Sequence, residues 1–119
     1  MDLEEIMAYC AAKKGAEHLY KPEWEADLYR LAEKMFVMIG GDREGTPIVS
    51  LKSEPEEAIR LREKYPAIIP GYYLNKQQWN SVYYHDPSIP AELVKKMIDD
   101  SYELVLAKLP KRTQAEIRG

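Results

Sequence analysis

Residues 69–79 read IPGYYLNKQQW and bring together a proline, a glycine, three aromatic rings, three amides and one lysine. The pair Pro70-Gly71 predicts a turn. Asn75, with a glutamine three residues later, has the spacing of a capping box, so one helical turn is expected from Asn75 to Trp79. Such a short turn should aim Lys76 outward while Trp79 folds back onto a sheet. The composition of this stretch is more specific than packing alone would need, so it is the first candidate for a functional region. The other predicted elements are described relative to it.

Four short runs rich in aromatic or branched residues precede this stretch and predict an antiparallel meander. They are Glu17 to Tyr20, Glu25 to Leu31, Lys34 to Ile39 and Pro47 to Leu51. Ala32-Glu33 is a weak hairpin turn because it lacks the glycine or asparagine that two-residue turns favour. Residues 40–45 (GGDREG) are a strong loop signal, and this loop is expected to project as a wing. A further strand is predicted over Asn80 to Tyr84.

Three helices are predicted around these strands. The first runs from Leu3 to Lys14 behind an Asp2 and Glu5 capping box, the second starts at Ser53 and ends before Pro66, and the third opens at Ser88 and Pro90 and stops at Pro110. Ser101 on the apolar face of the third helix suggests a close approach to the sheet. Residues 112–119 are polar and are expected to fray.

This order predicts an α+β fold in one domain over residues 1–119. The N-terminal and C-terminal helices should pack on one face of an antiparallel sheet. No segment approaches the ~20 apolar residues that a membrane span needs, and acids stand where a signal peptide would be basic, so a cytoplasmic protein without membrane contact is expected.

The charge of the chain limits where an anion could bind. The formal net charge is −3 and the pI is near 5.5, and residues 1–46 hold ten acids against six bases. Nucleic acids need local positive potential whatever the total charge is. Any anion-binding face is therefore expected in the second half of the chain.

The sequence lacks the common motifs of catalytic and metal-binding sites. The sequence has no glycine-rich phosphate loop, no His-Glu-x-x-His and no Gly-x-Ser-x-Gly. His18 and His85 lack metal-ligand spacing. Cys10 follows Leu3 and Ile6 at helical spacing and is expected to face the core. A protein that is not an enzyme, without a cofactor or metal, is the resulting expectation.

Tyrosine dominates the aromatic residues, with nine tyrosines and two tryptophans against one phenylalanine. Rings with a polar tip suit a domain edge or an interface, and the competing interpretation is that they simply cover the edge of the sheet. Two adjacent pairs, Tyr72-Tyr73 and Tyr83-Tyr84, should each expose one ring if they lie in strands, since neighbouring strand residues point to opposite faces.

Several of these elements together resemble the MmcQ/YjbR family. The resemblance rests on Pro47 to Lys52, Tyr65-Pro66, Ile69 to Tyr72, Leu74-Asn75-Lys76 with Trp79, and Ser101 to Val105 followed by Leu109-Pro110-Lys111. It covers nearly the whole chain. It implies a fold similar to CyaY, the bacterial frataxin homologue, and DNA binding through two wing-like hairpins. The family pattern carries over to Lys52, Asn75, Lys76, Trp79, Ser101, Tyr102 and Lys111.

Two functional hypotheses follow. The first is double-stranded DNA binding, with phosphate contacts from Lys52, Lys76, Lys108, Lys111 and Arg112 and a site shaped by Asn75, Trp79, Tyr72, Ser101 and Tyr102. The second is a module that binds a protein or a small anionic ligand through the Tyr72–Trp79 region, in a pocket beside Trp79 that contains Lys76. A monomer is expected in both cases.

A frataxin-like fold also raises the question of iron at the N-terminus. Asp2, Glu4 and Glu5 are explained more simply as capping residues that interact favourably with the helix dipole. No iron site is therefore predicted.

Overall fold

The computed structural model of the protein describes residues 1–72 and 74–119, so Tyr73 lies outside the described residues. Within them the chain forms four α-helices, one 3₁₀ turn and six strands. In chain order these are α1 (Leu3–Ala11), β1 (Glu17–Lys21), the 3₁₀ turn η1 (Pro22–Trp24), β2 (Ala26–Leu31), β3 (Lys34–Gly41), β4 (Pro47–Lys52), α2 (Pro55–Lys64), β5 (Ile68–Pro70), β6 (Trp79–Val82), α3 (Ala91–Ala107) and α4 (Lys111–Arg118). No helix in this described part of the chain is long and apolar enough to cross a membrane.

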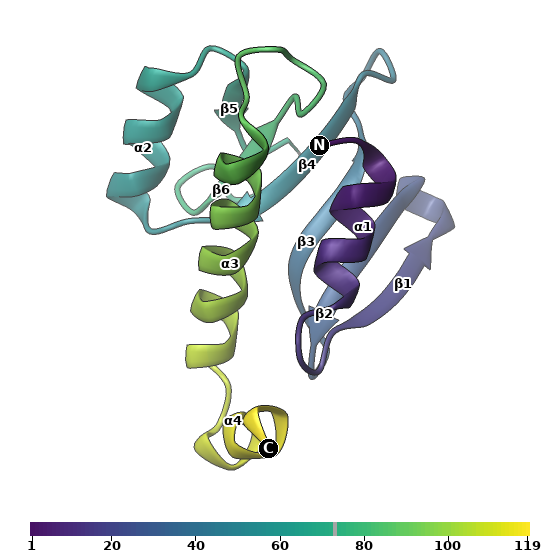
Figure 1. Ribbon diagram of the computed structural model, residues 1–119, viewed down its shortest axis with the longest axis vertical. Helices are drawn as coiled ribbons and strands as arrows, with labels where there is room; N and C mark the ends of the chain where they lie inside the picture. Colours follow the sequence, from purple (N-terminus) through teal and green to yellow (C-terminus); the bar gives the residue numbers. More distant parts are fainter. Residues whose placement is uncertain (73) are drawn as a thin grey trace.

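The strands form one antiparallel sheet in the order β1-β2-β3-β4-β6-β5. Figure 1 shows α1 and α3 lying across the same face of this sheet, as the sequence predicts. The Asn80 amide of β6 donates to the Ala58 carbonyl of α2 at 3.1 Å, and this hydrogen bond places α2 on that face as well. The prediction of an α+β fold with helices on one face is confirmed.

Residue alternation along the strands separates the two faces of the sheet. In β4 and β6, Leu51 pairs with Asn80 on the helix side and Ser50 pairs with Ser81 on the other side. The second side is called the helix-free face here. It carries Ala26, Leu28, Met38, Ile48, Ser50 and Ser81.

Ser101 holds α3 against the sheet. Its hydroxyl donates to the Phe36 carbonyl of β3 at 2.6 Å and accepts from the Lys52 N–H of β4 at 2.9 Å, and the residue is fully buried. A small polar residue allows the helix backbone to approach the strands and still satisfies both groups. The close approach predicted from the sequence is confirmed.

Several elements differ from the predictions, and the strand predicted over Asn80 to Tyr84 spans Trp79–Val82. The strand β5 was missed because three residues show no alternation, and its proline is tolerated because β5 is an edge strand. The helix α2 is capped by Glu54 rather than started at Ser53. The helix α1 ends at Ala11, before the glycine that closes the predicted helix.

Most of the C-terminal segment 112–119, which was expected to fray, belongs to the helix α4 (Lys111–Arg118), and Gly119 is its C-cap. Ile117 of α4 is half-buried against the main core and lies close to Gly15. The Lys14 ammonium donates to the Arg118 carbonyl at 2.7 Å, so the end of α4 is fastened to the loop after α1. The segment is too short to show a repeated apolar spacing, so the sequence did not predict a helix that packs Ile117 against the core.

The β2–β3 hairpin forms although its two turn residues are not the ones that such a turn favours. Ala32 and Glu33 both have positive φ, 44° and 72°, as a type I′ turn requires, although neither residue favours that region. The register between β2 and β3 also shifts at Tyr29 and Arg30. The hairpin is present in the structure, with local backbone strain at both turn residues.

Candidate functional site

The segment after β5 crosses the helix-free face. Gly71 N–H donates to the Trp79 carbonyl at 2.7 Å, and Tyr72 N–H donates to the Ser81 hydroxyl at 2.9 Å. Leu74 then packs against the small apolar cluster of Ala26, Leu28 and Met38. Because the Ser81 hydroxyl points away from the helices, these contacts place Tyr72 and Leu74 over the open side of the sheet.

A turn follows over Asn75 to Trp79, as predicted, but the Asn75 side chain does not form the expected capping box with Gln78. The Asn75 side chain accepts from the Gln77 N–H at 2.9 Å, and the Asn75 carbonyl accepts from the Trp79 N–H at 2.9 Å. Lys76 behaves differently from the prediction. Its ammonium folds back across the turn and donates to the Gly71 carbonyl at 3.1 Å, because that carbonyl faces the turn.

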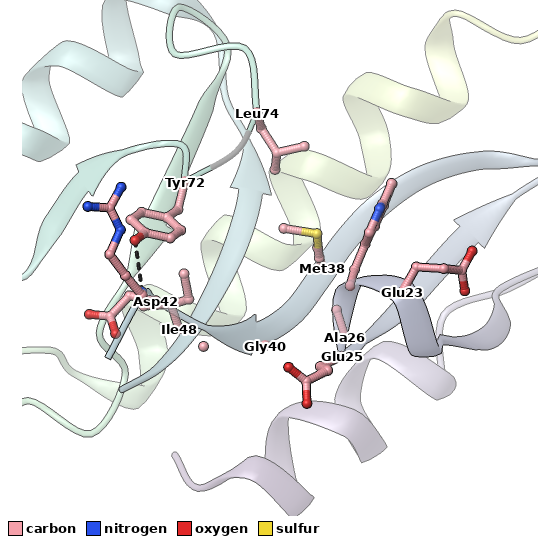
Figure 2. A pocket seen from close by; sticks show the side chains of 12 residues that line it. Glu23, Glu25, Ala26, Met38, Gly40, Asp42, Ile48, Tyr72 and Leu74 are labelled. Atoms are coloured by element: carbon pink, nitrogen blue, oxygen red, sulfur yellow. Dashed lines mark hydrogen bonds between the residues drawn. The ribbon is translucent and has the colours of Figure 1, made fainter. Parts of the chain in front are cut away.

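A cleft of about 560 Å³ lies on the helix-free face beside this segment. The described residues that line it are Glu23, Trp24, Glu25, Ala26, Met38, Gly40, Gly41, Asp42, Arg43, Ile48, Tyr72 and Leu74. Figure 2 shows Tyr72 and Leu74 on one side, Glu23, Glu25 and Ala26 on the other, and Met38, Gly40 and Ile48 between them. Strands β2, β3 and β4 supply its floor.

The β3–β4 loop forms one end of the cleft and is tied in place by Asp42. The Asp42 carboxylate accepts from the N–H groups of Glu44 and Thr46 and from the Tyr83 hydroxyl, all within 2.9 Å. The Tyr72 hydroxyl accepts from the Arg43 N–H at 2.8 Å, which joins this loop to the crossing segment (Figure 2). The loop projects beyond the helices, as expected of the predicted wing (Figure 1).

Of the predicted phosphate-binding cations, Lys52 and Lys108 are brought together. Partial burial lowers the pKa of the Lys52 ammonium, and the positive charge of Lys108 lowers this pKa further, against an opposing effect of Glu54. Lys111 and Arg112 begin α4, where Arg112 is almost fully exposed beside Glu116. Lys76 is engaged with the Gly71 carbonyl instead of joining the pair.

Acidic side chains border the Lys52 and Lys108 pair. A groove of about 280 Å³ between α2 and α3 is lined by Ser53, Glu54, Glu57, Asp100, Glu103, Leu104 and Ala107. Glu103 pairs with Arg118 at 3.3 Å and Asp100 pairs with Lys96 at 2.7 Å, so both acids are engaged by other cations. A phosphate backbone laid along the groove would still meet several carboxylates.

Several predicted residues have structural roles. Ser101 fastens α3 to the sheet, and the Tyr102 hydroxyl donates to the Lys14 carbonyl at 2.6 Å. Cys10 is fully buried, and burial raises the pKa of its thiol to about 12, so the thiol is not activated as a nucleophile. Within the described residues no group of three or more His, Cys, Asp or Glu is placed to hold a metal ion.

Two of the tyrosine and pocket predictions need correction. Tyr84 is buried and Tyr83 is half-buried, while Tyr73 lies outside the described residues. The cleft is not the predicted pocket beside Trp79 with Lys76 inside, because Tyr72 and Leu74 line it from that region and Lys76 and Trp79 do not. Lys76 bonds to the backbone of its own turn, which draws its charge away from the cleft.

The sequence interpretation missed Glu23, Trp24 and Glu25. A tryptophan between two acids, directly before a strand, was the available signal. Trp24 is 52% exposed, although such a large ring is usually covered. The local sequence does not indicate that the η1 turn lies across the cleft from Tyr72 and Leu74, some fifty positions later in the chain.

The fold and the cleft define the class of this protein. It is a small α+β protein whose single sheet carries helices on one face and an open cleft on the other. The model of the YjbR family matches residues 11–104, and the chain belongs to this family.

Comparisons with individual relatives agree with this assignment. The protein of Escherichia coli K12 named Uncharacterized protein YjbR is 36% identical over 110 residues, 92% of each chain. Uncharacterized protein YbdF of Escherichia coli O157:H7 is 37% identical over 94 residues, 79% of this chain and 75% of the relative.

Solved structures extend the comparison to the fold. The crystal structure of Deinococcus radiodurans protein DR2400, domain DUF419, matches with a TM-score of 0.85 at 28% identity over 97% of this chain and 86% of the other. The crystal structure of a Pseudomonas syringae protein matches with a TM-score of 0.75 at 25% identity over 88% of this chain and 99% of the other.

The close approach of Gly71 to Trp79 gives a first prediction. A Cβ at Gly71 would lie 2.7 Å from the Trp79 Cβ and 2.9 Å from its carbonyl oxygen, too close for any side chain. Gly71→Ala should therefore lower the free energy of unfolding by about 2 kcal/mol, measured by urea denaturation.

Gly40→Ala is the matched control for this substitution. A Cβ at Gly40 would make an ordinary contact of 3.4 Å with the Ala26 Cβ, and its stability should stay within about 0.5 kcal/mol of the parent. A Gly71→Ala protein as stable as the Gly40→Ala protein would contradict the close approach.

Proposed function

We propose that the chain is a non-enzymatic binding module whose small-ligand site is the cleft on the helix-free face. The observation that carries this proposal is the cleft itself, about 560 Å³, which is within the range of small-molecule sites. Ligand sites commonly combine an apolar floor with a few polar groups at the edge. Ala26, Met38 and Ile48 supply such a floor here.

The exposed Trp24 ring adds to this support. Its side chain lines the cleft and remains 52% exposed in the protein alone. A ligand in the cleft would cover part of this ring, and burial of aromatic area is a large source of binding free energy. Non-enzymatic binding fits the side chains of the cleft, because its Asp42 carboxylate is already committed to three hydrogen bonds.

A fragment screen followed by NMR tests this function. Bound fragments should shift the amide signals of Gly40 and Gly41 and the indole N–H signal of Trp24. Trp24→Ala should weaken the binding of each such fragment about tenfold, because the ring contributes roughly 1 kcal/mol or more of contact free energy.

Tyr20→Ala is the control in that experiment. Tyr20 is equally exposed, at 52%, and lies in the neighbouring strand β1 without lining the cleft. Its removal should leave fragment affinity unchanged. Fragments that shift only signals outside the cleft, or a collection in which no member binds, would overturn the proposal.

DNA binding is the second candidate function. It is supported by the family resemblance and by Lys52 and Lys108, two cations whose mutual repulsion a phosphate would relieve. Neither cation has an ion pair within the described part of the chain. Contacts of this kind would give salt-dependent binding with dissociation constants of roughly 10⁻⁴–10⁻⁶ M.

Fluorescence anisotropy of a labelled duplex tests the second candidate. The triple variant Lys52→Ala, Lys108→Ala, Lys111→Ala should lose binding at low salt. A second triple variant, Lys34→Ala, Lys64→Ala, Lys95→Ala, removes the same charge from other surfaces and should keep it. Equal losses in the two variants would show only a general charge effect, and either that result or no binding at low salt would reject DNA binding at this patch.

A further inference from the structure

The charges around the cleft are mostly negative. Among the described residues that line it, Glu23, Glu25 and Asp42 are acidic and Arg43 is basic. The hydrogen bond from Tyr83, together with those from the Thr46 and Glu44 N–H groups, lowers the pKa of Asp42, so this carboxylate stays ionised near neutral pH. A cleft lined by one sign of charge concentrates ions of the opposite sign.

Glu23 and Glu25 form no ion pair among the described residues, and the Lys21 ammonium lies over the ring of Trp24 between them. Both glutamates belong to the η1 turn or its C-terminal cap, and both lie across the cleft from Tyr72 and Leu74 (Figure 2). A ligand seated between the two walls would lie near both carboxylates. An anionic ligand would be repelled there, and a cationic one attracted.

The Trp24 ring also favours a positively charged ligand. The Lys21 ammonium lies over the Trp24 ring, 4.5 Å from the ring centroid. This contact shows that the indole already interacts with a cation in the folded protein. With this contact in place Trp24 is still 52% exposed and lines the cleft, so part of the ring remains open to a ligand.

The apolar floor distinguishes an organic cation from a simple ion. Ala26, Met38 and Ile48 offer no side-chain oxygen ligands, and the small part of them that is exposed, at most 7% of each residue, can contact methyl or methylene groups. A substituted ammonium presents apolar groups and a diffuse positive charge together, which suits a site with both an aromatic face and carboxylates.

We infer that the cleft binds a small organic ammonium ion, with Glu23 and Glu25 opposing its charge, Trp24 contacting it through the ring face, and the floor of the helix-free face packing against its apolar part. This inference rests on the proposed ligand-binding function and names the class of ligand. It also reverses the sign expected from the sequence, which pointed to an anionic ligand beside Lys76.

Three probes with one aromatic body and different charges test the inference. They are benzyltrimethylammonium, benzyl alcohol and benzoate, each titrated at constant ionic strength while the amide signals of Gly40 and Gly41 and the indole signal of Trp24 are followed. The cation should bind about tenfold more tightly than the alcohol, and benzoate should bind more weakly still. Raising the salt concentration should reduce the advantage of the cation.

Charge removal on the cleft wall identifies the groups responsible. The double variant Glu23→Gln, Glu25→Gln keeps the shape of the wall and should weaken benzyltrimethylammonium about tenfold while leaving benzyl alcohol unchanged. The control, Glu56→Gln with Glu63→Gln, removes two exposed carboxylates from α2 and should affect neither probe.

The outcomes separate the two levels of the proposal. Equal binding of the cation and the alcohol in the cleft would overturn the ammonium inference and leave the ligand-binding function standing. Equal weakening of the cation by both double variants would assign the preference to the overall charge of the protein and would also overturn it. If none of the three probes binds in the cleft, the ammonium inference is contradicted. The fragment screen would then decide whether the cleft binds small ligands at all.

Discussion

The close contact between Gly71 and Trp79 is the constraint on which the site depends. Only a glycine allows the backbone after β5 to lie against the first residue of β6, with the Gly71 N–H bound to the Trp79 carbonyl at 2.7 Å. From there the chain is directed across the helix-free face, where Tyr72 bonds to Ser81 and Leu74 reaches the Met38 cluster. With any other direction for this segment, the cleft would lose one wall.

The two faces of the sheet therefore have separate tasks. The helix side is closed by a large apolar core and by buried hydrogen bonds such as those of Ser101, which fix α3 on β3 and β4. The helix-free side carries a smaller apolar cluster, and its Ile48 is buried as well. Hydrogen bonds of Asp42 and Tyr72 connect the loops on this side, and the cleft lies between them and the η1 turn.

Local patterns in the sequence were sufficient for most of the fold. Alternation and capping signals predicted the long strands and helices, and helical spacing correctly placed Cys10 and Ser101 on the inner faces. The short strand β5 and the helix α4 lacked such periodicity. The cleft could not be predicted because the segment after β5 crosses the helix-free face and places Leu74 across the cleft from Glu23, two residues that are far apart in the sequence. The CyaY-like form of the fold remains a prediction from the resemblance.

The most direct test of this account is a methyl NOE spectrum of the free protein. If Tyr72 and Leu74 lie over the helix-free face, the Leu74 methyl groups should show NOEs to the Met38 methyl group and to the Leu28 methyl groups. These contacts would establish the wall of the cleft independently of any ligand. A spectrum in which Leu74 shows no NOE to either residue would contradict the placement of the segment, and with it the cleft and the functions proposed for it.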